Sequence, residues 1–198
     1  MAGLRRYHSG DLGALYDICL RTGDSGADAS PLHNDPKLLG HFYAAPYGVL
    51  EPENVFVAED EQGVAGYIVG TFDTRAFEAR LEREWWPDLR RHYANVPEAT
   101  LTEADRMRVT AIHETALNPE EIVARYPAHI HMNLLPRLRG QRVGTRLLQM
   151  WIAQAQAAGV SGIHLGASPS NAGGIAFWTR SGFVPLRTQG AVWFGMEL

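Results

Sequence analysis

One stretch of the chain joins a strand pattern, a glycine-containing loop and a helix pattern without interruption. Residues 128–135 read as a buried strand, and residues 146–158 place apolar side chains at helical spacing. Between them lies the sequence Arg-Gly-Gln-Arg-Val-Gly-Thr, residues 139–145. A loop that enters a helix directly after a strand presents unpaired backbone N–H groups at the positive end of the helix dipole. The segment therefore predicts an anion-binding loop, with a phosphorylated cofactor lying over residues 140–145.

Two common phosphate loops do not fit this segment. A Walker loop ends in Gly-Lys-Ser or Gly-Lys-Thr, and the chain contains neither triplet. A dinucleotide fingerprint requires Gly-x-Gly-x-x-Gly, which residues 139–145 do not supply. A Gly-x-Ser-x-Gly hydrolase elbow is absent as well.

The segment resembles the Arg/Gln-x-x-Gly-x-Gly/Ala loop of the GCN5-related N-acetyltransferases (the GNAT family), which binds the pyrophosphate of acetyl-coenzyme A. Arg139 matches its first position and Gly144 its last glycine, whereas Arg142 replaces the middle glycine. We expect Arg142 to keep a negative φ, because any residue can then offer its backbone N–H without strain. Its guanidinium could add a contact to phosphate.

A second motif follows in the order that the family has. Residues 171–183 resemble the family pattern Asn-x-x-Ala-x-x-Phe-Tyr-x-x-x-Gly-Phe, with an alanine that sits later than usual. Asn caps a helix well, and a glycine just after a helix commonly ends it. The matching residues are Asn171, Ala176, Phe177, Gly182 and Phe183.

The pattern of the remaining chain agrees with this resemblance. Residues 55–60 and 64–71 read as a hairpin, and residues 10–21 and 102–117 as helices, the second of which starts with a capping-box pattern at residues 102–105, whereas residues 46–53 read as irregular. The resemblance implies an α/β (α+β) GNAT fold, a mixed twisted sheet of about seven strands with helices on both faces. We expect one domain over residues 1–198, with a helical insertion at about residues 74–126 between the third and fourth strands.

Three segments resemble a particular branch of the family. Residues 19–32, residues 64–73 and the helical insertion are similar to the acetyltransferase-like C-terminal domain of O-GlcNAcase and its bacterial stand-alone relatives. That domain lacks an intact cofactor loop and is regarded as a pseudo-enzyme. Here the loop is largely kept, which implies retained binding of acetyl-CoA.

Composition excludes several other classes of function. The net charge is −4 and 45% of the residues are hydrophobic, which gives no sign of a nucleic-acid or membrane partner. The N-terminal residues 1–6 lack the apolar core of a signal peptide, so we expect a cytoplasmic protein. Cys19 is the sole cysteine and is expected to be a buried apolar residue. No metal site is expected, because the eight histidines do not cluster at ligand spacing.

The resemblance also implies which residues hold the cofactor. A backbone N–H at Leu134 or Leu135 would stabilise the oxyanion that forms on the thioester. Trp178 replaces the tyrosine that usually protonates the leaving thiolate, and we expect it to pack against the pantetheine instead. The implied cofactor-binding residues are Leu134, Leu135, Arg139, Gly140, Gln141, Arg142, Val143, Gly144, Thr145, Asn171 and Trp178.

The reaction also needs a group that takes a proton from the amine, since alkyl amines are protonated at neutral pH. Alternation along residues 128–135 puts His129, His131 and Asn133 on one face of a strand, and a histidine there could accept this proton. Asp28, in a polar loop, could bind a cationic amine or act as the base. Both assignments have plainer alternatives: hydrogen-bonded strand residues for the histidines and a turn residue for the aspartate.

The sequence thus predicts an acetyl-CoA-dependent N-acetyltransferase that transfers acetyl to an amine, either a small molecule or a protein, by direct attack. One alternative is a weak or inactive acetyltransferase-like module that binds CoA or a protein partner. Another is an acyl-CoA hydrolase. The acceptor, the general base and acid, and the oligomeric state are left open by the sequence, with a homodimer among the alternatives.

Overall fold

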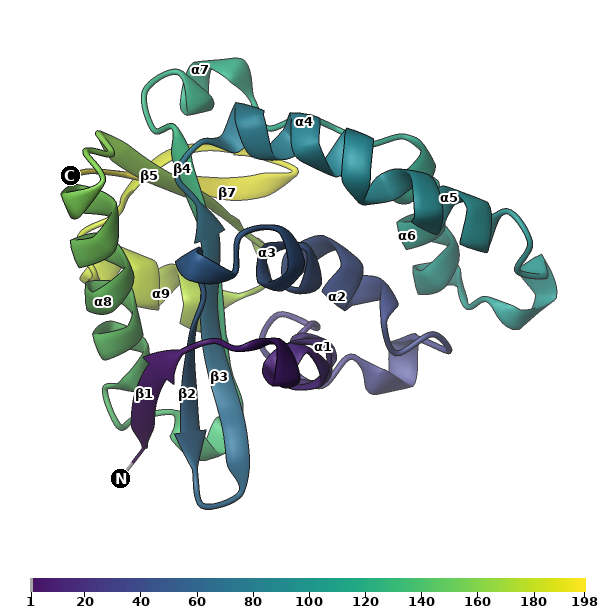
Figure 1. Ribbon diagram of the computed structural model, residues 1–198, viewed down its shortest axis with the longest axis horizontal. Helices are drawn as coiled ribbons and strands as arrows, with labels where there is room; N and C mark the ends of the chain where they lie inside the picture. Colours follow the sequence, from purple (N-terminus) through teal and green to yellow (C-terminus); the bar gives the residue numbers. More distant parts are fainter. Residues whose placement is uncertain (1) are drawn as a thin grey trace.

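A computed structural model describes residues 2–198, apart from the side chain of Gln189. Met1 lies outside the described residues; it is the first residue of the segment considered above for a signal peptide. Its centre is one mixed sheet with the strand order β1-β2-β3-β4-β5-β7-β6 (Figure 1). All neighbouring pairs are antiparallel except β4 and β5, which run parallel. The strands are β1 (Gly3–Arg6), β2 (Phe56–Asp60), β3 (Gly63–Thr71), β4 (Ala128–Leu134), β5 (Gly162–Ala167), β6 (Val184–Gln189) and β7 (Ala191–Glu197).

Helices cover both faces of this sheet, as predicted. Helices α8 and α9 lie on one side of the strands and α1, α2 and α3 on the other (Figure 1). The buried Trp151 of α8 reaches the backbone of β3, where an added Cβ on Gly70 would lie only 2.8 Å from its ring. The helices flanking the sheet are α1 (Leu12–Leu20), α2 (Leu38–Tyr43), α3 (Ala45–Leu50), α8 (Val143–Ala157) and α9 (Ala172–Arg180).

The predicted helical insertion between the third and fourth strands is present. It projects from the sheet beside α2 and α3 (Figure 1). The Thr102 hydroxyl accepts a hydrogen bond from the Asp105 N–H and the Asp105 carboxylate accepts one from the Thr102 N–H, which is the expected capping box. The insertion comprises α4 (Thr74–Glu84), α5 (Trp86–Tyr93), α6 (Glu103–His113) and α7 (Glu120–Val123).

The structure corrects the sequence prediction at residues 46–53. This segment is helical, with α3 followed by a 3-10 turn at Pro52–Asn54. Pro46 lies in the first turn of α3, where a missing N–H costs nothing because that N–H has no partner within the helix. Proline reads as a helix breaker in sequence, so its position at a helix start concealed the element.

Within residues 2–198, none of the helices has the length and apolar content needed to cross a membrane. The core lies mainly between the sheet and its flanking helices, and Cys19 is buried in it as predicted.

Candidate functional site

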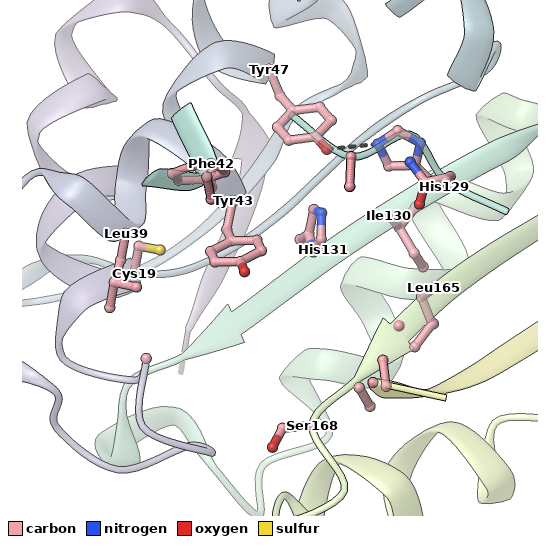
Figure 2. A pocket seen from close by; sticks show the side chains of 18 of the residues that line it. Cys19, Leu39, Phe42, Tyr43, Tyr47, His129, Ile130, His131, Leu165 and Ser168 are labelled. Carbon is pink, nitrogen blue, oxygen red and sulfur yellow. Dashed lines mark hydrogen bonds between the residues drawn. The ribbon is translucent and has the colours of Figure 1, made fainter. Parts of the chain in front are cut away.

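The sheet opens between its two parallel strands. β4 and β5 pair at two positions, Ala128 with Ile163 and His129 with His164, and are not paired further along. A cavity of about 760 Å³ occupies this region and continues toward α2, α3 and the helical insertion. Figure 2 shows side chains of β4, β5 and the neighbouring helices around it. The opening is therefore a break in the hydrogen-bonded sheet, with polar backbone at its edge.

The backbone of β4 presents hydrogen-bonding groups to this opening. The Leu135 N–H donates to the Ala65 carbonyl of the β3 side over 2.8 Å. Along an antiparallel strand, alternate residues point their N–H and C=O groups to opposite edges. Met132 and Leu134 therefore point theirs away from β3, toward the opening. Of the two predicted oxyanion donors, Leu134 remains available, and Leu135 is excluded because its N–H is already used.

The loop before α8 adopts a conformation that the sequence prediction missed. Arg142, the N-cap of α8, has a φ of 57° and lies in the left-handed region, not at the expected negative φ. Gly140 also has a positive φ, of 75°. The left-handed geometry explains why a glycine occupies this position in the family pattern. An arginine there costs about 1–2 kcal/mol of backbone strain.

The start of α8 keeps its unpaired N–H groups. The first backbone bond of the helix runs from the Arg146 N–H to the Arg142 carbonyl, which leaves the N–H groups of Val143, Gly144 and Thr145 without an intrahelical acceptor. Among the described residues, no side chain caps this end of the helix. The exposed Arg142 lies at the same place, so positive charge and free N–H groups coincide.

Two side chains of this loop are already engaged. The Arg139 guanidinium donates to the Gly26 carbonyl over 2.6 Å and to the Leu134 carbonyl over 3.3 Å. The exposed Gln141 donates to the Arg137 carbonyl over 2.7 Å. Arg139 therefore links the loop both to the edge of β4 and to the segment that follows α1.

Gly144 is required for packing as well as for its place in the loop. An added Cβ would lie 3.2 Å from a Leu134 methyl, 3.3 Å from the Met132 methyl and 3.4 Å from the Phe177 ring. These contacts are tighter than ordinary van der Waals distances. The glycine thus lets α8 approach both β4 and α9 closely.

The second motif, residues 171–183, borders the opposite side of the opening. The Asn171 side chain caps α9 by accepting a hydrogen bond from the Gly174 N–H over 2.8 Å. Asn171 and the buried Trp178 both line the cavity. Trp178 also packs edge-on against Phe177 and Phe183.

The structure confirms that His129, His131 and Asn133 share one face of β4, since they are paired with Thr71, Val69 and Tyr67 of β3. His129 is buried and fixed on both sides. The Thr74 hydroxyl donates to the Pro127 carbonyl over 2.7 Å, so over 2.8 Å it must accept from His129 Nδ1. His129 Nε2 then accepts from the Tyr47 hydroxyl over 2.6 Å (Figure 2).

His131 differs from His129 because its ring nitrogens have no hydrogen-bond partner among the described residues. Its ring lies edge-on to Tyr43 and Tyr47, with centroids 5.4 and 5.7 Å away, and lines the cavity (Figure 2). Burial and the nearby His164 lower the pKa of His131 to about 4. At neutral pH this imidazole is uncharged and has a free lone pair.

Asp28 lies away from this centre. Its carboxylate accepts hydrogen bonds from the Ser30 N–H over 2.9 Å and from the Ser30 hydroxyl over 2.6 Å. These bonds lower the pKa of its carboxyl group. Asp28 is exposed and does not line the cavity, so its role here is that of a turn residue.

Sequence reasoning missed several residues that the fold brings to the cavity. Tyr43 and Tyr47 come from α2 and α3, and His164 and Trp193 from β5 and β7. The alternation of residues 161–167 could have placed His164 on one strand face. Nothing in the sequence shows that this face meets that of His129, whose ring centroid lies 5.5 Å from that of His164. Within residues 2–198, His, Cys, Asp and Glu side chains form no cluster that could hold a metal ion.

Comparisons with known proteins agree with this geometry. The family model described as "Acetyltransferase (GNAT) family" matches residues 27–183. The chain is 25% identical over 180 residues to Protein O-GlcNAcase of Rattus norvegicus and, equally, of Mus musculus. The match covers 90% of this chain and 20% of each relative, so the chain spans about a fifth of their length.

Solved structures share the same fold. The crystal structure of SsHAT is 34% identical and superposes with a TM-score of 0.88, covering 99% of this chain and 98% of that one. PH1933 from Pyrococcus horikoshii OT3 is 12% identical, with a TM-score of 0.63 and coverage of 100% and 99%. Chaetomium thermophilum Naa20 in complex with a bisubstrate analogue is 20% identical, with a TM-score of 0.57 and coverage of 99% and 86%.

Proposed function

Since the chain belongs to the acetyltransferase (GNAT) family, we propose that it transfers the acetyl group of acetyl-CoA to an amine by direct attack on the thioester. The observation that carries this proposal is the opening between β4 and β5. It combines unpaired strand edges and a cavity with an uncapped helix start nearby: Gly144 of α8 packs next to Met132, which lines the cavity.

The donor side, defined as the free edge of β4 at Met132 and Leu134 together with residues 139–145, fits acetyl-CoA. Met132 lines the cavity, and Arg139 donates a hydrogen bond to Gly26, which also lines it. The pantetheine arm carries amide groups that can pair with the free strand edge, as an added strand would. The free N–H groups at the start of α8 and the guanidinium of Arg142 suit a pyrophosphate. Leu134 offers a backbone N–H to the charge that develops on the thioester oxygen.

Asn171 and Trp178 complete the donor side on the lip formed by α9. Trp178 presents an apolar ring to the cavity, which suits packing against the pantetheine. Its indole is not a useful acid, so this chain lacks a proton donor at the usual tyrosine position. CoA thiol resembles cysteine, with a pKa of about 8.5, so it can leave largely as the thiolate.

The acceptor side of the cavity, defined by Tyr43, Tyr47, His131, His164 and Trp193, supplies the remaining chemistry. We assign His131 as the group that takes the proton from the attacking amine, because its lone pair is free and faces the cavity. His129, the other candidate base, is instead assigned as a positioning residue, because both of its nitrogens are engaged by Thr74 and Tyr47. Loss of this first proton gives the amine a lone pair; its nitrogen then bonds to the acetyl carbon, the carbon–sulfur bond breaks, CoA leaves as the thiolate, and the nitrogen loses its second proton to the thiolate or to water.

The proposal is tested first by binding and then by turnover. Titration calorimetry should detect acetyl-CoA, and at 100-fold excess over its Kd the ligand should stabilise the fold by about 2.7 kcal/mol. Release of CoA thiol is then measured with and without a panel of amines. Release that depends on an amine supports transfer.

Two other outcomes would contradict the proposal. Thiol release at the same rate without an amine identifies an acyl-CoA hydrolase. Binding of acetyl-CoA without release, with every amine tested, identifies a catalytically inactive CoA-binding module.

A further inference from the structure

Two buried polar atoms of the acceptor side have no hydrogen-bond partner among the described residues: Nε2 of His164 and Nε1 of Trp193. His164 is fully buried. Its Nδ1 lies 2.6 Å from the Tyr126 carbonyl, and because a carbonyl only accepts, Nδ1 must carry the hydrogen. Among the described residues, Nε2 of the neutral ring is then an acceptor without a donor, and the indole Nε1–H of Trp193 is a donor without an acceptor.

The sheet register places these two side chains next to each other. β5 and β7 are antiparallel, with His164 opposite Gly195 and Trp193 opposite Gly166. Side chains two residues apart along a strand share a face, so His164 and Trp193 point to the same side of the sheet. Their ring centroids are 6.0 Å apart.

This face of the sheet is also the face of the β4 histidines. His164 is paired with His129 at the last position before β4 and β5 separate. Both His164 and Trp193 line the same cavity as His131. The two unpartnered atoms therefore lie at the closed end of the opening, on the face that carries His131, the proposed base.

Each buried polar group that lacks a hydrogen-bond partner destabilises a protein. A ligand relieves both if it offers one hydrogen-bond donor and one acceptor at neighbouring atoms. An isolated alkyl amine, once its lone pair is directed at the thioester, has only N–H donors left. An amine in which the carbon next to the amine-bearing carbon carries an oxygen offers both a donor and an acceptor.

Given the proposed function, on which this inference rests, we propose that His164 and Trp193 form a recognition subsite for a particular class of acceptor. In these acceptors the carbon next to the amine-bearing carbon carries an oxygen. His164 Nε2 accepts an N–H of the amine, and Trp193 Nε1–H donates to the neighbouring oxygen. The same chemistry occurs in two sources: an amino sugar, where the oxygen is a hydroxyl, and the N-terminus of a peptide, where it is a carbonyl.

A matched pair of small amines tests the subsite. Ethanolamine and n-propylamine differ by a hydroxyl in place of a methyl group. Their kcat/KM values are compared per concentration of unprotonated amine, because the hydroxyl also lowers the amine pKa. We expect ethanolamine to be favoured at least tenfold, since a site built to bind an oxygen discriminates against an analogue without one. Glucosamine and alanine amide then distinguish the two sources by which of them has the higher kcat/KM.

Trp193→Phe provides the matched variant, because it removes the N–H and keeps an aromatic ring. It should abolish the preference for ethanolamine by lowering its kcat/KM to that of n-propylamine, with an unchanged affinity for acetyl-CoA. Equal use of both amines by the wild-type protein would overturn the subsite. A Trp193→Phe variant that slows both amines equally would show a merely structural role for the indole.

Failure of this inference and failure of the proposed function are distinguishable. Binding of the same two amines to the CoA-saturated protein, measured by calorimetry, tests the subsite without any turnover. Tighter binding of ethanolamine that is lost in Trp193→Phe supports the subsite even if no acetyl group is transferred. Transfer to amines without this preference contradicts the subsite alone.

Discussion

The donor side and the acceptor side of the cavity are built from different parts of the chain. Apart from Asn171 and Trp178, the donor side runs from Met132 to Thr145 along the chain and uses mostly backbone groups. The acceptor side gathers side chains from α2, α3, β4, β5 and β7. A site made of backbone depends on conformation and on the room left by small residues, whereas a site made of side chains depends on each residue's chemistry. Substitutions on the two sides should therefore have different signatures.

The largest effect is expected on the acceptor side. His131→Ala should lower kcat about 100- to 10,000-fold, the usual contribution of a positioned base, with unchanged affinity for acetyl-CoA. Steady-state kinetics and calorimetry on the same preparation measure the two quantities. Activity should recover in part at high pH, where the amine loses its proton unaided.

Asn133→Ala is the control for this variant, because Asn133 lies on the same face of β4, two residues further along. It should keep most of the turnover. An His131→Ala variant with wild-type kcat would remove His131 from the mechanism.

On the donor side, Gly144→Val should act through packing. Its methyl groups would press further into the space that Leu134, Met132 and Phe177 already fill. We expect the free energy of unfolding to fall by about 1–3 kcal/mol and acetyl-CoA to bind more weakly, because α8 must shift away from β4. Urea unfolding and calorimetry measure both effects.

Alanine at two helical glycines gives the matched comparison. Gly13 in α1 has nothing within 4 Å of an added Cβ, so Gly13→Ala should gain up to about 1 kcal/mol of helix propensity. Gly144→Ala should gain less, because its Cβ meets close neighbours. Equal gains at both positions would contradict the packing role of Gly144.

The acceptor side should also make stability depend on pH. Burial lowers the pKa of His131 to about 4, and it lowers the pKa values of His129 and His164 as well. Between pH 6.5 and about 4 the unfolded chain binds a proton at His131 and the folded protein does not, and the lowered pKa values of His129 and His164 act in the same direction. The free energy of unfolding should therefore fall as the pH falls through this range, by at most about 1.4 kcal/mol per pH unit for each histidine.

Urea unfolding at pH 7, 6 and 5 tests this dependence. His131→Gln should reduce the slope of stability against pH, because it removes one of the groups that titrate. His113→Gln, at an exposed position of α6, is the control. A slope that is the same in wild type and His131→Gln would contradict the assignment.

The smallest effect is expected at Arg142. Arg142→Gly relieves the strain of a left-handed residue but increases the freedom of the unfolded chain, so we expect a gain of no more than about 1 kcal/mol. Thermal melting measures this gain. The affinity for acetyl-CoA separates two roles: tighter or equal binding means that the backbone conformation matters, and weaker binding means that the guanidinium contacts phosphate.

The sequence predicted the fold and the family correctly where its signals are local. A strand, loop and helix that follow one another, as in residues 128–158, fix their own geometry through periodicity and helix ends. The Thr102 capping box and the shared face of His129 and His131 were predicted for the same reason. Local conformation was harder to predict from the sequence. The positive φ of Arg142 contradicted the expected negative φ, and the helix at Ala45–Leu50 contradicted the expected irregular segment.

The acceptor side was decided by the tertiary structure. Whether His129 or His131 has a free lone pair depends on Tyr47 and Thr74, which lie 82 and 55 residues away from His129 in the chain. The juxtaposition of His164 and Trp193 depends on the register of β5 with β7. Periodicity assigns a residue to a face of its own element, but long-range strand pairing and helix packing determine which faces meet. The sequence by itself therefore determined the family and indicated the segment that we propose for the donor side. Only the fold determined which side chains are placed for the proposed recognition and deprotonation of an acceptor.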